Sequence, residues 1–184
     1  FALTILSINQ LGEIKALFAI VSIQNLLFQV LDQYSLIKVS KIIKEEGLLK
    51  GSNYILSLQK TLILGSIILL LIIIFISPYL LNLIYGTELL HLENHLRLIF
   101  IYPILNSLIY PRKVFLIASD KSKYSLIGYI ITCIFSFAFL KPFLNTFGNF
   151  GLLLIFLFGQ IISLICIYPN IFFKNIFLLR KNLN

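Results

Sequence analysis

Basic residues gather in three stretches of this chain, and long apolar segments lie between them. Twelve of the fifteen Lys and Arg residues lie in Lys38–Lys60, Arg112–Lys123 and Lys174–Lys181, and the other three are Lys15, Arg97 and Lys141. In proteins that cross a bilayer several times, the connections on the cytoplasmic side carry an excess of Lys and Arg. The alternation therefore predicts a multi-pass protein of the cytoplasmic (inner) membrane whose basic connections lie in the cytoplasm.

The composition is not that of a water-soluble domain. Hydrophobic residues make up 59% of the chain and charged residues 12%, whereas soluble domains carry about twice that charged share. The net charge of +8 could also indicate nucleic acid, but cations beside apolar segments orient helices and contact anionic headgroups. We therefore expect membrane lipids as partners and no nucleic acid.

A helix needs about twenty mostly apolar residues to cross the hydrocarbon of a bilayer. Five segments meet this requirement, namely Ala16–Leu36, Leu58–Ile76, Leu96–Ser119, Tyr124–Leu140 and Phe150–Tyr168. The third contains Pro103 and Pro111, so it must be kinked or end before Pro111. We expect an all-α, polytopic membrane helix bundle with about five transmembrane helices, in one membrane domain over residues 1–184.

The positive-inside pattern also assigns each connection to a side of the membrane. It puts Asn9–Lys15 and Pro78–His95 outside, and the carboxy terminus in the cytoplasm. The segment Lys38–Gln59 mixes apolar and charged residues, which predicts an amphipathic helix lying on the inner face. The chain has no methionine, even at position 1. We expect a fragment or a processed chain, with Phe1–Ile8 as the tail of an incomplete span.

Polar side chains in the first span form one stripe. Ser22, Asn25, Gln29 and Asp32 follow one another at steps of three, four and three, and Gln33 lies beside them. This spacing puts them on one helical face, which should line a cavity or a helix interface. Substrate contact and hydrogen bonding between helices are both open roles for this face. Asp32, near the inner end, could instead be solvated.

Arg112 and Lys113 are the second group of interest. If the third helix continues past Pro111, both cations lie a turn or two inside the membrane boundary and need an anionic partner. A pyrophosphate is one such partner, and Asp32 or Asp120 is another. If Pro111 ends the helix, both residues are ordinary cytoplasmic anchors.

Enzymatic and metal sites find little support in the sequence. His91 and His95 stand at i and i+4, but Glu93 is not placed as in HExxH and a third ligand is not evident. A phosphate-binding glycine loop and a nucleophile elbow are both missing. A membrane polysaccharide polymerase would need acid and base residues on a substantial outer loop, and Pro78–His95 is short for this. We expect no metal, no cofactor and no enzymatic activity.

One outer segment resembles a known family. Residues 77–86, Ser-Pro-Tyr-Leu-Leu-Asn-Leu-Ile-Tyr-Gly, are similar to the "P-x-L-L-x-L-L-Y-G" segment of polysaccharide (O-antigen type) flippases, members of the multidrug/oligosaccharidyl-lipid/polysaccharide exporter superfamily. Leu11–Glu13, Leu116–Lys121 and Asn145–Gly151 resemble further family segments, in the family's order. The resemblance covers nearly the whole chain. The chain departs from it at Leu152–Leu154, where the family has small residues, and in its two prolines of the third span.

The resemblance implies a fold and a function. The five spans would correspond to the last five of roughly twelve helices, in the second bundle of a MATE-like transporter, and the partner would be the missing amino-terminal half. The substrate would be a polyprenyl-pyrophosphate-linked oligosaccharide, flipped across the membrane for polysaccharide or lipopolysaccharide biosynthesis.

The same resemblance implies roles for individual residues. Arg112 and Lys113 would contact the pyrophosphate, and the stripe residues Asn25, Gln29 and Asp32 would line the cavity. An alternative within the superfamily is a multidrug/cation antiporter, in which Asp32 would couple transport to an ion. Because a rocking transporter needs both bundles, we expect no transport by this chain alone.

Overall fold

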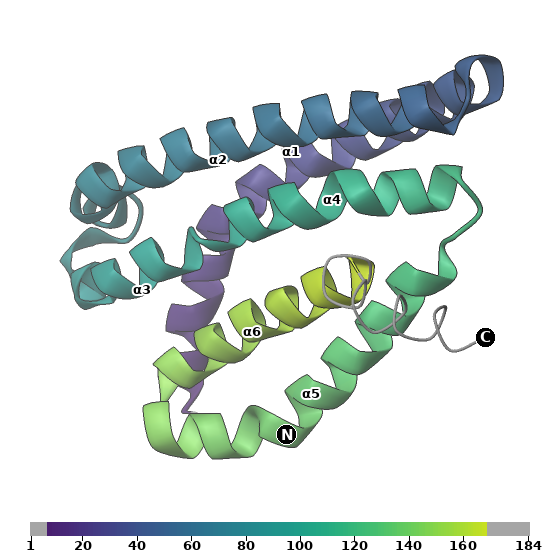
Figure 1. Cartoon of the computed structure of the whole chain (residues 1–184). Coiled ribbons are helices and arrows are strands. Elements are labelled where there is room, and N and C mark those ends of the chain that lie inside the picture. The colour runs from purple at the N-terminus through teal and green to yellow at the C-terminus, as the bar shows by residue number, and fades with distance from the viewer. Residues whose placement is uncertain (1–6, 169–184) are drawn as a thin grey trace.

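The computed structural model describes residues 7–168, and all regular structure in this range is helical (Figure 1). The elements in chain order are α1 (Ile8–Glu46), α2 (Leu48–Tyr85), the 3₁₀ helix η2 (Gly86–Leu92), α3 (Glu93–Ile99), α4 (Tyr102–Ala118), α5 (Lys123–Phe147) and α6 (Asn149–Ile167). The all-α class predicted from the sequence is confirmed for these residues.

Three helical stretches of the described chain are long and apolar enough to cross a membrane. They are Leu48–Ala118, Lys123–Phe147 and Asn149–Ile167. The first of these folds back at η2, so that α2 and α4 lie side by side (Figure 1). The two parts of α1, Asn9–Ile23 and Phe28–Glu46, meet the same criteria only together and are bent by 40°. These helices are compatible with a membrane-embedded protein, and the number of five spans stays a prediction.

The helix connections gather at two opposite ends of the bundle. Figure 1 shows the α1–α2 hairpin and the α4–α5 connection at one end, and η2 with the α5–α6 turn at the other. Of the three basic stretches, Lys38–Lys60 and Arg112–Lys123 therefore approach the same end, which we call the basic end. Lys174–Lys181 lies outside the described residues. The side of the membrane that the basic end faces stays a prediction.

Two apolar clusters hold the first helices of the chain together. The first lies near η2 and joins Leu17 and Val21 of α1 to Leu81 of α2 and to Leu96 and Ile99 of α3. The second lies nearer the basic end and joins Phe28 and Val39 of α1 to Ile55 of α2 and to Tyr110 and Val114 of α4. Because the second cluster draws on three helices, it fixes the position of α4 and of the residues that follow Tyr110.

Small residues set the close contact between α5 and α6. A Cβ atom on Gly128 would lie 3.1 Å from the Cβ of Cys166, and one on Gly159 would lie 2.9 Å from a methyl carbon of Thr132. The Thr132 hydroxyl donates to the Gly159 carbonyl oxygen at 3.1 Å. Small side chains let helix backbones approach closely in membrane proteins, where apolar burial contributes little to association. The α5–α6 hairpin is thus held by close packing.

Large apolar side chains also cover the outer faces of the bundle. Phe75 and Leu83 on α2 are 74% and 84% exposed, and Phe137 on α5 is 71% exposed. Apolar patches of this extent are rare on proteins in water. In the hydrocarbon of a bilayer the same faces meet lipid tails, which fits the apolar composition of the chain.

The prediction that residues 38–59 form an amphipathic helix on the inner face is wrong. Residues 38–59 form the end of α1 and the start of α2, which meet at Gly47 with φ of 91°. Beyond this turn the two helices touch directly, because a Cβ on Gly51 would lie 2.5 Å from a side-chain carbon of Ile43. Val39, Ile43 and Ile55 therefore pack between the two arms of a hairpin, whereas Leu48 and Leu49 at its tip are exposed.

The break in the third expected span does not occur at Pro111. Helix α4 continues through Pro111 to Ala118, so the alternative in which Pro111 ends the helix is wrong. The chain breaks instead at Phe100–Ile101, between α3 and α4. Pro103 then falls in the first turn of α4, where the missing N–H of proline costs no helical hydrogen bond.

The expected outer turn at Asn9–Lys15 is helical. Ser7 caps α1: its hydroxyl accepts from the Gln10 N–H at 3.2 Å, and the Gln10 side-chain oxygen accepts from the Ser7 N–H at 3.0 Å. This reciprocal capping box satisfies two backbone donors and starts the helix at Ile8. Most of the predicted tail of an incomplete span, residues 1–6, lies outside the described residues.

We expect Gly151→Ala to lower the free energy of unfolding by about 1–3 kcal/mol, because the added methyl would collide with the backbone carbonyl of Phe143, which cannot move as a flexible side chain can. Gly12→Ala is the matched control: it lies in α1 with no atom within 4 Å of the added methyl. It should stabilise slightly through helix propensity. Thermal unfolding in mild detergent, followed by circular dichroism, measures both. Equal stability of the two variants would contradict the close approach at Gly151.

Candidate functional site

A basic pocket lies at the basic end, where α4, α5 and α6 meet. Its volume is about 420 Å³, within the range of small-molecule sites. Its lining residues are Arg112, Phe115 and Leu116 from α4, Asp120 and Lys121 from the α4–α5 connection, Lys123 and Tyr124 from α5, and Ile167 from α6. Three cations thus face one carboxylate across a partly apolar cavity, which favours an anionic ligand.

The connection after α4 is shaped by a helix-ending motif. The Lys121 N–H donates to the Leu116 carbonyl at 2.7 Å, and the Asp120 N–H donates to the Ile117 carbonyl at 3.2 Å. This is the Schellman arrangement, which requires a left-handed residue, and Asp120 has φ of 57°. Aspartate tolerates this conformation better than most residues. The motif reverses the chain within a few residues and brings Lys121 and Lys123 to the same cavity as Arg112.

Aromatic rings position Arg112. Its guanidinium carbon lies 5.2 Å from the ring centroid of Phe115 and 5.6 Å from that of Tyr168. The Tyr168 hydroxyl donates to the Leu108 carbonyl at 3.2 Å and accepts from Gln59 at 2.8 Å. Within residues 7–168, the buried Nε of Arg112 has no hydrogen-bond partner. Ring faces hold the cation by cation–π attraction and leave its N–H groups available for a ligand.

Lys113 takes a different direction from Arg112. Its ammonium lies 5.5 Å from the ring centroid of Tyr129 on α5. Successive residues on a helix point about 100° apart, so one of the two cations faces the pocket and the other a neighbouring helix. The structure therefore separates the two residues that the sequence paired as pyrophosphate contacts.

The residues of the polar stripe on α1 have different surroundings. The Asn25 side-chain oxygen accepts from the Tyr102 hydroxyl at 3.0 Å, which places Asn25 at the interface with α4. The Ser22 hydroxyl donates back to the Ala19 carbonyl at 2.7 Å. Gln29 is exposed, and Asp32 is half-buried. Because α1 bends between Ile23 and Phe28, these residues do not share the face of one straight helix.

An apolar pocket lies beside this stripe, between α1 and α2. It has a volume of about 310 Å³ and is lined by Phe28, Leu31, Thr61, Leu62, Gly65, Ser66 and Leu69. Of the two polar side chains that line this pocket, only Ser66 is buried. Its hydroxyl lies 2.7 Å from that of Ser107 on α4. The lining is suited to an apolar chain and offers little to a charged group.

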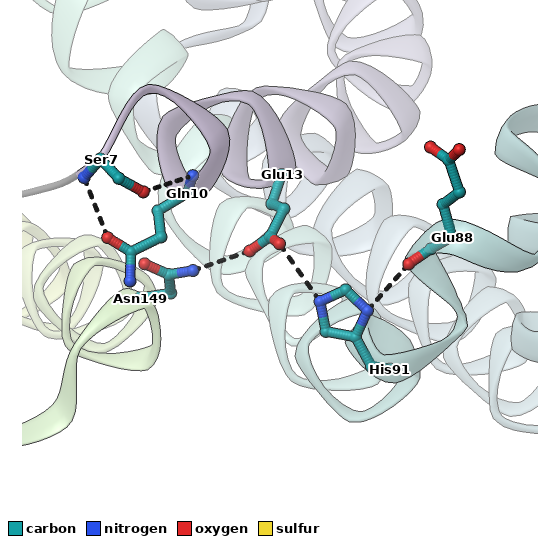
Figure 2. Close-up of polar contacts among 6 residues, drawn as sticks. All are labelled: Ser7, Gln10, Glu13, Glu88, His91 and Asn149. Carbon is teal, nitrogen blue, oxygen red and sulfur yellow. Dashed lines mark hydrogen bonds and ion pairs between the residues drawn. The ribbon is translucent and has the colours of Figure 1, made fainter.

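A second polar cluster, drawn in Figure 2, lies at the end of the bundle where Figure 1 shows η2 and the α5–α6 turn. The Glu13 carboxylate of α1 accepts from the Asn149 side-chain N–H of α6 at 2.8 Å and lies 3.3 Å from Nε2 of His91 in η2. The other ring nitrogen of His91 lies 3.0 Å from the Glu88 carbonyl oxygen. These contacts join three elements that are distant in sequence.

The histidines and acids of residues 91–95 do not gather around one point. Glu93 pairs with Arg97, whose Nε donates to the Ser77 hydroxyl at 3.0 Å. His95 packs its ring edge-on against Phe150. Burial lowers the pKa of His95 and the nearby His91 lowers it further, whereas Glu13 raises it. Across residues 7–168, no three His, Cys, Asp or Glu side chains are placed to hold a metal ion.

Several site residues were not singled out by the sequence. Lys121 and Lys123 were noted only as members of a basic stretch or of a segment resembling the family, and Gln59 and Tyr168 only as the ends of expected segments. Tyr168 acts through its place at the end of α6, next to α4, which a single sequence does not reveal. Comparison of the sequence with protein families, curated proteins and solved structures finds no match.

We expect Arg112→Gln to weaken the binding of inorganic pyrophosphate by about tenfold or more, because it removes charge-assisted hydrogen bonds inside the pocket. Lys113→Gln removes the same charge at the next residue, outside the pocket lining, and should change affinity by less than about threefold. Isothermal titration calorimetry of the detergent-solubilised chain measures both. Equal losses would show that the anion responds to the charge of the whole basic end.

Proposed function

We propose that this chain is the carboxy-terminal part of a membrane transporter that flips polyprenyl-pyrophosphate-linked oligosaccharide across the cytoplasmic membrane for polysaccharide biosynthesis. The observation that carries the proposal is the basic pocket at the end of long apolar helices. Arg112, Lys121 and Lys123 supply three cations there, and the ionised oxygens of a pyrophosphate headgroup can accept hydrogen bonds from several cations at once. Arginine and lysine are the residues suited to phosphate oxygens.

The surroundings of the pocket suit a lipid-linked ligand. Exposed apolar side chains cover the outer faces of α2 and α5, where a polyprenyl tail can remain in the hydrocarbon. The pocket itself mixes cations with Phe115, Leu116 and Ile167, so a headgroup can be bound while the first isoprene units contact apolar walls. A soluble anion would need no such apolar lining.

The resemblance to polysaccharide flippases supports the same proposal. In the structure, the segment Ser77–Gly86 ends α2 and enters η2, at the end opposite the basic pocket. An outer segment of a flippase would lie on this side if the basic end is cytoplasmic. The proposed role of this chain is binding and transport together with a missing amino-terminal half, in a protein of two bundles.

A second candidate function rests on Asp32. This carboxylate is half-buried within the first expected span, and none of the ion pairs found among residues 7–168 includes it. Half-buried acids in membrane helices often bind the coupling ion of a transporter. A multidrug/cation antiporter of the same superfamily would depend on Asp32 more than on Arg112.

Binding to the chain in nanodiscs tests the proposal. We expect a polyprenyl-pyrophosphate-linked sugar to bind, and inorganic pyrophosphate to compete with it. A neutral polyprenyl glycoside of the same length should bind at least about tenfold more weakly, because it lacks the charge-assisted contacts. Equilibrium binding of fluorescent lipids measures these affinities, and equal affinity for the two lipids would overturn the proposal.

Two variants separate the candidate functions. Arg112→Gln should weaken binding of the pyrophosphate lipid about as much as that of inorganic pyrophosphate. Asp32→Asn should leave it within about threefold, because Asp32 does not line the basic pocket. Loss of lipid binding in Asp32→Asn with retention in Arg112→Gln would favour the antiporter.

A further inference from the structure

A triangle of hydrogen bonds joins α2, α4 and α6 next to Arg112 of the basic pocket. The Gln59 side-chain amide of α2 donates to the Tyr168 hydroxyl at 2.8 Å and to the Leu108 carbonyl of α4 at 3.4 Å. The Tyr168 hydroxyl donates to the same carbonyl at 3.2 Å. The two N–H groups of the amide and the phenol proton thus each have an acceptor within the triangle.

Gln59 and Tyr168 do not line the basic pocket themselves, so any effect on a ligand must pass through a lining residue. That residue is Arg112, whose guanidinium carbon lies 5.6 Å from the ring centroid of Tyr168. None of the ion pairs found between residues 7 and 168 includes Arg112, and its buried Nε has no hydrogen-bond partner in that range. Aromatic rings are therefore the contacts that hold this guanidinium.

The two rings beside Arg112 do different work. Phe115 stands three residues after Arg112 on α4, so it shares a helical face with the cation and moves with it. Tyr168 follows the last residue of α6, so it fixes the guanidinium relative to a second helix. The Tyr168 backbone N–H still donates to the Leu164 carbonyl, but the direction of the side chain is set by the partners of its hydroxyl.

Gln59 brings a further helix into this arrangement. Helix α2 packs against α4 but contributes no residue to the lining of the pocket. An apolar side chain in place of the half-buried Gln59 could fill its space but could not donate a hydrogen bond. The Tyr168 hydroxyl would then keep only the Leu108 carbonyl as a partner within the triangle, and its ring would be freer to turn away from Arg112.

We propose that Gln59 is a positioning residue for the anion site: through Tyr168 it holds the Arg112 guanidinium in the orientation that binds a pyrophosphate group. The inference rests on the proposed function, because it concerns the affinity of the same pocket for its anionic ligand. It adds α2 to the helices on which that affinity depends, although no atom of α2 lines the pocket.

Binding of inorganic pyrophosphate to the detergent-solubilised full chain, measured by isothermal titration calorimetry, tests this role. We expect Gln59→Leu to weaken binding about threefold and Tyr168→Phe about fivefold, because both remove hydrogen bonds of the triangle. Tyr168→Leu also removes the ring and should weaken binding about tenfold. Recovery of part of the affinity in Tyr168→Phe, relative to Tyr168→Leu, separates the contribution of the ring from that of the hydroxyl.

A double variant shows whether Gln59 acts through Tyr168. If it does, Gln59→Leu combined with Tyr168→Phe should weaken binding about fivefold, as Tyr168→Phe does alone, because the hydroxyl on which Gln59 acts is already gone. Two independent effects would instead multiply to about fifteenfold.

Ser66→Ala is the matched control. The Ser66 hydroxyl lies 2.7 Å from that of Ser107, also between α2 and α4, and Ser66 does not line the basic pocket. This variant should change pyrophosphate affinity by less than about twofold, although it removes a buried polar contact between the same two helices. Circular dichroism checks that each variant is folded at the temperature of the titration, and if Gln59→Leu is not, Tyr168→Phe decides against the same control.

Three results would overturn this inference and leave the anion site intact. The first is parental affinity in Gln59→Leu and Tyr168→Phe while Arg112→Gln still weakens binding. The second is an equal loss in Ser66→Ala, which would show a general effect of packing between α2 and α4. The third is multiplication of the two effects in the double variant. A parent chain that does not bind pyrophosphate would instead refute the anion site of the proposed function, and this inference with it.

Discussion

Hydrogen bonding of the backbone is the constraint on which the rest of this structure depends. A chain this apolar has few side chains that could satisfy exposed N–H and C=O groups, and within a bilayer no water replaces them. Long helices solve the problem, and the chain can reverse only where a residue accepts an unusual backbone conformation. Gly47, Gly86, Gly148 and Asp120 have positive φ, and each lies at a connection between helices. The reversals then decide which side chains meet at each end.

The two ends of the bundle have different chemistry as a result. At the basic end, the Schellman turn after α4 brings Lys121 and Lys123 beside Arg112, and Tyr168 at the end of α6 supplies an aromatic wall. At the opposite end, the side chains of one acid, one histidine and one amide, from α1, η2 and α6, meet in one polar cluster.

Helix packing connects the two ends. The α5–α6 hairpin is held by close contacts of glycine and threonine, and α6 also contacts α4 and α3. Helix α6 begins at Asn149, whose side chain donates a hydrogen bond to Glu13. It is followed at its other end by Tyr168, whose ring lies beside the Arg112 guanidinium. A shift of α6 would therefore change the polar cluster and the wall of the basic pocket together, because packed helices move as rigid bodies.

Much of the fold could be predicted from the sequence, because helix formation in an apolar chain is decided by local hydrogen bonds and by runs of hydrophobic residues. The apolar runs predicted the helices, and the grouping of basic residues predicted that Lys38–Lys60 and Arg112–Lys123 approach one end of the bundle. The same local rules failed where contacts between helices compete with them. Pro111 remains inside α4, and the break occurs at Phe100–Ile101. The segment expected to lie on the membrane surface extends two helices into a hairpin, because Ile43 packs against Gly51.

The candidate site was predicted only in part, for the same reason. A cation after Pro111 was expected to need an anionic partner, but only the packing of α4 against α5 and α6 decided that Arg112 faces the pocket and that Lys113 faces Tyr129. Glu13, His91 and Asn149 have no common pattern in the sequence, since a tertiary contact between them depends on three chain reversals. The sequence by itself determined the helices and the distribution of charge along the chain, through local hydrogen bonding and hydrophobicity. Only the tertiary structure decided which of those charges meet, because that depends on how close the helices can approach one another.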